Sequence, residues 1–176
     1  MLENAQTRTC QSETIRRVKV KRSDLTTAQM MERVGFEIGV SDWVLVDQQS
    51  MNQFGESTKD PDWLHVDPVR ARAEGPYGGT VAFGFWTLGM LTHCSHQLGM
   101  WPSDVAYGIN YGLDRVRWIE PVPVGSRIRV RCILESLGRR EDGRFLIKTR
   151  NTTEIEKCDR PAMVADWLGL FVLGRS

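Results

Sequence analysis

No charge of one sign prevails in this sequence. Lys and Arg total 23, Asp and Glu total 22, and the formal net charge at neutral pH is +1. Such a balance creates no overall electrostatic field that would recruit a nucleic acid or a membrane surface. We therefore expect no nucleic-acid partner and no membrane partner. A small neutral or locally steered ligand fits this composition better.

Cysteine is scarce, and the four cysteines lie far apart in the chain: Cys10, Cys94, Cys132 and Cys158. Their spacing forms neither a metal-ligand pair nor a compact disulfide framework, so we interpret them as reduced, mostly structural thiols. The sequence also lacks a glycine-rich phosphate-binding fingerprint. No nucleotide cofactor is therefore expected.

Long apolar runs are missing as well. No uninterrupted run could span a bilayer, and residues 1–6 have no apolar core of the kind that directs export. These absences lead us to expect a cytoplasmic protein.

The chain length of 176 residues suits one domain, because domains most often contain roughly 100–150 residues with a broad tail. We expect residues 1–35 to form an N-terminal arm with a short helix over 27–34, and residues 36–176 to form a single domain. The basic run 16–22 is interpreted as part of a solvated tail, with phosphate binding as the alternative. Ser23 or Asp24 could cap the short helix.

The most informative stretch contains Asp60 and His65, five positions apart. Pro61 cannot continue a helix entered from its N-terminal side, and it favours an extended conformation at Asp60. Residues 61–64 can then form one further turn that brings His65 back toward Asp60. A histidine held near a carboxylate can remove a proton from water close to neutral pH. The same spacing also suits a helix cap and a surface ring, so spacing alone leaves both interpretations open.

The residues before this stretch predict a strand and a helix. Residues 41–46 have the β-branched and aromatic content of a strand, and Asp47 is a suitable N-cap for a helix over 48–58. In that helix, Met51 and Phe54 have the spacing of a stripe that faces the core. The helix would deliver Asp60 to its place.

The most apolar stretch of the chain is 81–99, which predicts a helix that ends at Gly99. Because its apolar residues surround most of the helix, we expect it to be central and buried. If it begins near Gly84, that residue's N–H has no intrahelical partner and, with the helix dipole, suits a developing oxyanion. Close packing explains this glycine equally well. His93 and His96 have no obvious further ligand nearby, so they are interpreted as polar positions and no metal is expected.

Residues 106–173 contain one strand pattern after another, separated by short turns. In the strand 126–134, apolar side chains alternate with three arginines: Arg127, Arg129 and Arg131. One face of the sheet is therefore solvated. Neighbouring strands with short turns predict an antiparallel meander whose apolar face needs a cover. The sequence thus predicts an α+β fold, with a curved antiparallel sheet wrapped around one long buried helix.

The order of these features resembles the MaoC-like dehydratases, or R-specific enoyl-CoA hydratases, and within them the branch of NodN-like nodulation proteins. The resemblance covers about residues 36–173 and rests on three segments: Asp60 to Asp67, Val81 to Phe85, and Asn110 to Arg117. The Asp-x4-His signature is specific in this context, whereas the strand patterns are generic. The resemblance implies the hotdog fold.

The same resemblance implies an activity and roles for three residues. In the family, the signature Asp and His correspond to Asp60 and His65, and the glycine that opens the central helix corresponds to Gly84. The implied reaction is hydration of trans-2-enoyl-CoA to (R)-3-hydroxyacyl-CoA, and the reverse dehydration. His65 would act as the base toward water, with Asp60 positioning it and assisting proton return. The substrate carries coenzyme A, so no separate cofactor is expected.

One residue departs from the family pattern, since Ala82-Phe83-Gly84 stands where the family commonly has Ala-His-Gly. Phe83 would either line the acyl pocket or pack in the core. Together with Phe54 and Phe85, it completes the predicted substrate-binding residues.

Two other functions stay open: an acyl-CoA thioesterase of the same fold, because fold does not fix function, and a non-catalytic acyl-CoA binding protein. The resemblance also implies a homodimer in which two sheets join edge to edge. Arg115, Arg117 and the arginines at 127, 129 and 131 are candidate cations for the phosphates of CoA.

Overall fold

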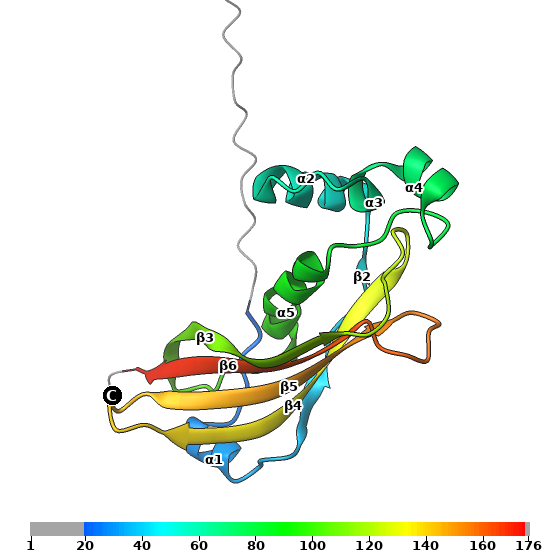
Figure 1. The fold of residues 1–176 in the computed structure, drawn as a ribbon. Coiled ribbons are helices and arrows are strands. Elements are labelled where there is room, and N and C mark those ends of the chain that lie inside the picture. The colour runs from blue at the N-terminus through cyan, green and yellow to red at the C-terminus, as the bar shows by residue number, and fades with distance from the viewer. Residues whose placement is uncertain (1–19, 175–176) are drawn as a thin grey trace, which may run out of the picture.

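The computed structural model describes residues 20–174 of the chain, and all of its strands belong to one antiparallel sheet (Figure 1). The strand order is β1-β4-β5-β6-β3, and β2 pairs with β4 beside β1. The strands are β1 (Glu37–Val40), β2 (Val44–Leu45), β3 (Val105–Trp118), β4 (Arg127–Arg139), β5 (Phe145–Ile155) and β6 (Met163–Leu173). The sheet and the helix on it confirm the predicted α+β hotdog fold.

The sheet is not the simple meander expected from the order of its strands. β4, β5 and β6 are neighbours in sequence order, but β3 pairs with β6 and not with β4. The segment 119–126 must therefore pass from β3, at one margin of the sheet, beyond β6 and β5 to reach β4. Alternation within a strand defines its faces but not its partner, which is why the local pattern did not predict this pairing.

The central helix is α5 (Gly84–Leu98), and Gly99 ends it with a left-handed φ of 71°. Figure 1 shows α5 between the sheet and the segment that carries α2, α3 and α4. Leu91, Cys94 and Leu98 are buried. Phe85, in contrast, is 70% exposed, so the sheet covers only part of this helix and the expectation of complete burial was too strong.

The N-terminal part of the described chain contributes to the core. Helix α1 (Thr27–Met31) is shorter than expected, and Thr26 caps it through the backbone N–H of Gln29, so neither Ser23 nor Asp24 is the cap. Met30 is buried in a cluster that includes Leu98 and Leu134. The domain boundary at residue 35 stays a prediction, and most of the basic run lies outside the described residues.

The strand expected over 41–46 is displaced. The β1 strand precedes it, and only Val44 and Leu45 pair with β4. Between them, the Ser41 hydroxyl accepts a hydrogen bond from Val130 N–H, and the Asp42 N–H donates to the side chain of Gln97. These side-chain bonds replace the regular ladder at this point.

Three short helices follow: α2 (Gln48–Thr58), α3 (Trp63–Val66) and α4 (Pro68–Glu74). Each begins at an aspartate whose carboxylate accepts backbone N–H groups, Asp47 for α2, Asp62 for α3 and Asp67 for α4. The expected helix 48–58 is confirmed with these bounds.

None of the described helices combines the length and apolar character that crossing a bilayer requires.

The described cysteines are free thiols. Cys94 and Cys132 are buried, and Cys158 is exposed; Cys10 lies outside the described residues. Burial raises the pKa of the Cys132 thiol to about 12 and also raises the pKa of Cys94. Both buried thiols are therefore protonated at neutral pH and act as small apolar side chains.

Candidate active site

The end of α2 places Asp60. Lys59 adopts a left-handed conformation with φ of 59°, which ends the helix, and the Asp60 N–H donates to the carbonyl of Gly55 at 2.9 Å. Gly55 makes this close approach possible, because a Cβ there would lie only 3.0 Å from the Asp60 carbonyl oxygen. The Asp60 side chain is exposed. Gly55 thus allows the chain to turn back against the last turn of α2, and this turn places Asp60 directly after the helix.

His65 lies on the single turn of α3, as the sequence predicted, and its ring has a defined orientation. Its Nδ1 lies 2.8 Å from the carbonyl oxygen of Val81. Because a carbonyl can only accept, Nδ1 carries the proton in the neutral ring and Nε2 keeps its lone pair. This is the tautomer that a general base needs at Nε2.

An aromatic wall lies behind the His65 ring. The ring centroids of His65 and Phe83 are 3.9 Å apart, and those of Phe83 and Phe54 are 5.1 Å apart. Phe83 is only 4% exposed and belongs to the main core cluster. Phe83 is therefore a core residue, and its ring packs against the His65 ring from the side of the core.

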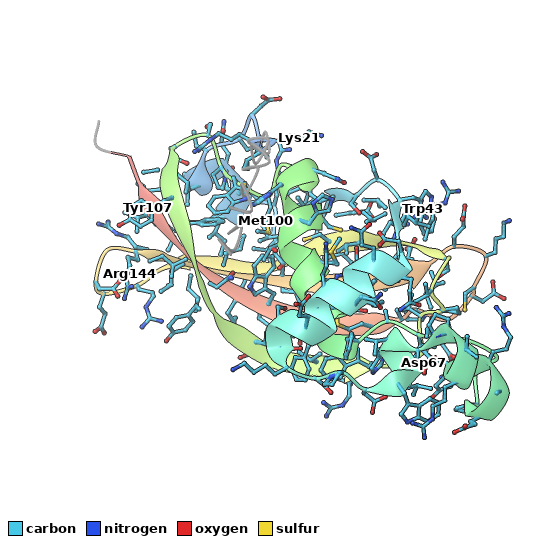
Figure 2. All side chains as sticks on the ribbon, turned by 90° about the horizontal axis from the view of Figure 1, so that it is seen from above. Lys21, Trp43, Asp67, Met100, Tyr107 and Arg144 are labelled. Carbon is cyan, nitrogen blue, oxygen red and sulfur yellow. The ribbon has the colours of Figure 1, made fainter. Side chains whose placement is uncertain are left out.

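The structure brings Asp60 and His65 to the same end of the molecule without joining them. Within residues 20–174, no hydrogen bond or ion pair links the two side chains. In an enzyme without ligand, catalytic hydrogen bonds are often long and tighten only around the substrate. Asp67, at the α3–α4 junction, marks this end in Figure 2, and Tyr107 on β3 marks the opposite end.

Gly84 opens α5, as expected. The N-cap residue Phe83 makes no side-chain cap hydrogen bond, so the first-turn N–H groups of α5 receive no acceptor from its side chain. The packing explanation for Gly84 also has support, because a Cβ there would lie 2.9 Å from Nε1 of Trp118. That Nε1 donates to the Gly84 carbonyl at 2.9 Å.

A cavity of about 280 Å³ lies beside Gly84. Its lining includes Tyr77, Thr87, Trp118 and Val122. Phe85 lies on the outside, where its ring meets Trp118 edge-on at 5.4 Å between centroids. In the described part of the chain, the lining of this cavity includes neither Asp60 nor His65. The single chain thus presents the carboxylate and imidazole on one side of Phe83 and the helix N-terminus on the other.

The arginines of β4 prove to have partners. Arg129 and Arg131 both pair with Glu154, Arg127 pairs with Glu156, and Arg131 also pairs with Glu37. Burial raises the pKa of Glu154, but hydrogen bonds from Arg129 and Arg131 outweigh it, and the net pKa is lowered. These arginines are thus neutralised within the chain. They are poor candidates for binding CoA phosphates.

Two arginines of β3 differ from those of β4. Among residues 20–174, Arg115 and Arg117 make no ion pair. They stay available as cations.

The described residues contain no group of three or more His, Cys, Asp and Glu side chains arranged to hold a metal ion, and His93 lies beside Gln97 on α5.

Sequence reasoning missed Gln48. Its side chain donates to the His65 carbonyl at 2.7 Å and accepts from the Thr80 hydroxyl at 2.6 Å. A glutamine at the first position of a helix resembles any polar surface residue, so no signal in a single sequence distinguishes it. Only the fold shows that residues 48, 65 and 80 meet.

The open antiparallel sheet with one long helix across it defines a protein of the hotdog fold. Comparison with protein families agrees: the family described as MaoC like domain matches residues 29–156. The chain belongs to the MaoC-like dehydratase family, and the resemblance noted in the sequence is confirmed.

Relatives cover most of the chain. Nodulation protein N from Rhizobium leguminosarum bv. viciae is 39% identical over 145 residues, which is 82% of this chain and 90% of that protein. The 3-hydroxyacyl-thioester dehydratase Z of Mycobacterium tuberculosis is 40% identical over 147 residues, 84% of this chain and 96% of the relative. Among solved structures, an R-hydratase from Pseudomonas aeruginosa has a TM-score of 0.61 at 16% identity, and the match covers 87% of this chain and 93% of that one. The structural match supports the fold.

Proposed function

We propose that this protein adds water to trans-2-enoyl-CoA to give (R)-3-hydroxyacyl-CoA, and catalyses the reverse dehydration. The family and the similarity to a 3-hydroxyacyl-thioester dehydratase support a lyase that adds or removes water. One observation carries the assignment: the His65 Nδ1–H donates to Val81, so Nε2 is left as a base close in sequence to the exposed carboxylate of Asp60.

The proposed reaction uses the site in the following way. The thioester carbonyl oxygen accepts a hydrogen bond from Gly84 N–H, aided by the dipole of α5, which makes C3 electrophilic. Asp60 holds a water beside the double bond, and His65 Nε2 removes a proton from it. The water oxygen bonds to C3 while the π-electron pair moves to C2, leaving an enolate.

The enolate then takes up at C2 the proton that His65 Nε2 removed from the water, with Asp60 assisting its return, and the site regains its starting protonation. Water addition changes no net oxidation state, so the proposed reaction requires no redox cofactor. Coenzyme A enters and leaves as part of the substrate. Phe54 and Phe85 are proposed to contact the acyl group, while Phe83 supports His65 from the core side.

The experiment that tests this function uses two thioesters. Purified protein is incubated with crotonyl-CoA and, separately, with butyryl-CoA. The proposal predicts that the conjugated absorbance of crotonyl-CoA is lost without release of free thiol, and that butyryl-CoA is unchanged. Free thiol from both thioesters would show a thioesterase, and tight binding of crotonyl-CoA without turnover would show a binding protein. Either result would overturn the proposal.

We also propose that the protein acts as a homodimer in the cytoplasm. β3 is the margin of the sheet, and it carries large exposed apolar side chains: Tyr107, Ile109, Tyr111, Leu113 and Trp118. An exposed, apolar edge strand favours pairing with another strand, and a second copy of the chain offers the same edge in return.

A joined pair of β3 edges would also affect the site. Arg115 and Arg117 lie on this strand. Their positive charge would then be close to both copies, so we propose them as the cations for the CoA phosphates. Light scattering at micromolar concentration tests the dimer, since a monomer mass would contradict it.

A further inference from the structure

Gln48 connects two segments that together orient His65. Its Nε2 donates to the His65 carbonyl at 2.7 Å and to Oδ1 of Asn52 at 2.9 Å, and its Oε1 accepts from the Thr80 hydroxyl at 2.6 Å. Thr80 immediately precedes Val81, whose carbonyl accepts from the His65 ring. We propose that Gln48 is a positioning residue for His65, a role that rests on the proposed hydratase function.

The orientation of the Gln48 amide is determined by its partners. The His65 carbonyl can only accept, so the NH2 group must face it. The oxygen of the amide then faces Thr80, whose hydroxyl donates. A flipped amide would place two acceptors 2.7 Å apart at His65 and would lose that bond. The amide therefore fixes both segments in one arrangement.

These hydrogen bonds hold the segment 64–65 against the segment 80–81. Leu64 is the residue before His65, and its carbonyl accepts a hydrogen bond from the Val81 N–H at 3.2 Å. Gln48 joins His65 to Thr80, and Val81 joins back to both Leu64 and the His65 ring. A shift of Thr80 or of the His65 backbone would thus lengthen the bond from Nδ1 to the Val81 carbonyl.

The chemical consequence concerns the tautomer. While the Val81 carbonyl accepts from Nδ1, the neutral ring keeps its proton there and presents a lone pair at Nε2. Without that acceptor in place, the ring can carry its proton on Nε2, which removes the base that faces the substrate. Gln48 would thereby affect catalysis without touching the reacting atoms.

Two variants and one control test this role. Gln48→Met has similar length but no amide, and Thr80→Val removes the hydroxyl that donates to Gln48. Gln49→Met is the control, because Gln49 is the next residue of α2 and is exposed. Each variant is examined for its melting temperature, for kcat and KM with crotonyl-CoA, and for the ¹⁵N spectrum of its imidazoles at a pH where they are neutral.

The proposal predicts that wild-type His65 is mainly the Nδ1–H tautomer and that both variants shift toward Nε2–H. His93 and His96 on α5 serve as internal references, since the chain has 3 histidines. We expect kcat to fall by about 10- to 100-fold with little change in KM, because misplacement of a catalytic group by about 1 Å can cost roughly 100-fold. The double variant should lose little more than either single variant, since both break one bond network.

The control should match the wild type in all readouts. If either the tautomer or kcat is unchanged in both Gln48→Met and Thr80→Val, the positioning role is wrong, even where the melting temperature falls. The two variants act from opposite sides of the amide, so one remains informative if the other does not fold. If the wild type does not hydrate crotonyl-CoA, the proposed function fails, and the tautomer spectrum still decides what Gln48 does.

Discussion

Two regions of this molecule differ in whether their charged and apolar side chains have partners within the same chain. On β4, Arg127, Arg129 and Arg131 all have carboxylate partners, and the alternate side chains Ile128, Val130 and Cys132 are buried. Around α3 and the start of α5, in contrast, Asp60 has no ion-pair partner among residues 20–174, and the ring of Phe85 is exposed.

This difference indicates where the protein meets other molecules. Paired charges and buried apolar groups stabilise one chain alone, whereas unpaired carboxylates and exposed rings gain nothing until a ligand or partner arrives. The β4 face is thus a structural surface. The opposite side is where substrate and a second copy of the chain are expected to bind.

The largest effect is expected from the proposed catalytic pair, Asp60 and His65. Replacing His65 with Gln, or Asp60 with Asn, should lower kcat for crotonyl-CoA by about 100-fold or more, because removal of a general acid or base typically costs 10²–10⁴. Arg129→Gln on β4 is the matched control and should retain nearly full activity. Steady-state kinetics with a melting curve for each variant checks this. Near-normal rates in both site variants would refute the assignment.

The next effect concerns the β3 margin. Ile109→Lys combined with Leu113→Lys would place like charges opposite each other if two β3 edges pair, and lysine on an edge strand blocks such pairing. We expect the mass measured by light scattering at micromolar concentration to fall from dimer to monomer. Leu45→Lys on β2 is the control, since Leu45 is an exposed apolar residue at the other margin of the sheet. A variant that stays dimeric would exclude this edge as the interface.

A smaller effect is expected at Phe83, which packs against both His65 and Phe54. Phe83→His places a polar ring in a site that is 4% exposed, and a buried polar group without a partner costs about 1–3 kcal/mol. The melting temperature should therefore fall while KM stays unchanged for two acyl chain lengths. A raised KM at unchanged melting temperature would show instead that Phe83 lines the acyl pocket.

The smallest effect should come from the β4 ion pairs. The pKa of Glu154 is lowered in the folded chain, because hydrogen bonds from Arg129 and Arg131 outweigh the raising effect of burial. A carboxylate with a lowered folded pKa stabilises the fold above its ordinary pKa, and this stability is lost as the pH falls through the folded value. Glu154→Gln should thus cost about 1 kcal/mol or less near pH 7 and almost nothing well below pH 4. Urea unfolding at several pH values measures it, and a cost that grows toward acid would contradict the sign.

Local sequence signals predicted much of this architecture. Asp47, Gly84 and Gly99 act at helix ends as expected, because capping depends on a few neighbouring residues. Pairing of β3 with β6 was not predicted, since it depends on contacts between distant segments. The irregular backbone at Ser41 was missed for the same reason, because its hydroxyl bonds to Val130 across the sheet.

In the candidate site, too, features that depend on neighbouring residues were predictable, whereas contacts between distant segments were not. The sequence proposed Asp60 and His65 from a short motif and Gly84 as the start of the apolar helix; the structure places His65 on α3 and Gly84 at the first position of α5, and their roles stay predictions. The aromatic contact of Phe83 with His65 and the hydrogen bonds of Gln48 were beyond a local pattern. Such contacts require the folded arrangement of α2, α3 and the residues before α5.

In the proposed reaction, water adds across the carbon–carbon double bond and not to the thioester. Incubation of the wild-type protein with crotonyl-CoA in ¹⁸O-labelled water, followed by mass spectrometry, tests it directly. We predict an intact CoA thioester heavier by one labelled water, with the ¹⁸O at C3, and formation of this product about 100-fold or more slower with His65→Gln. Free crotonate that carries ¹⁸O in its carboxylate, with release of unmodified CoA, would contradict it.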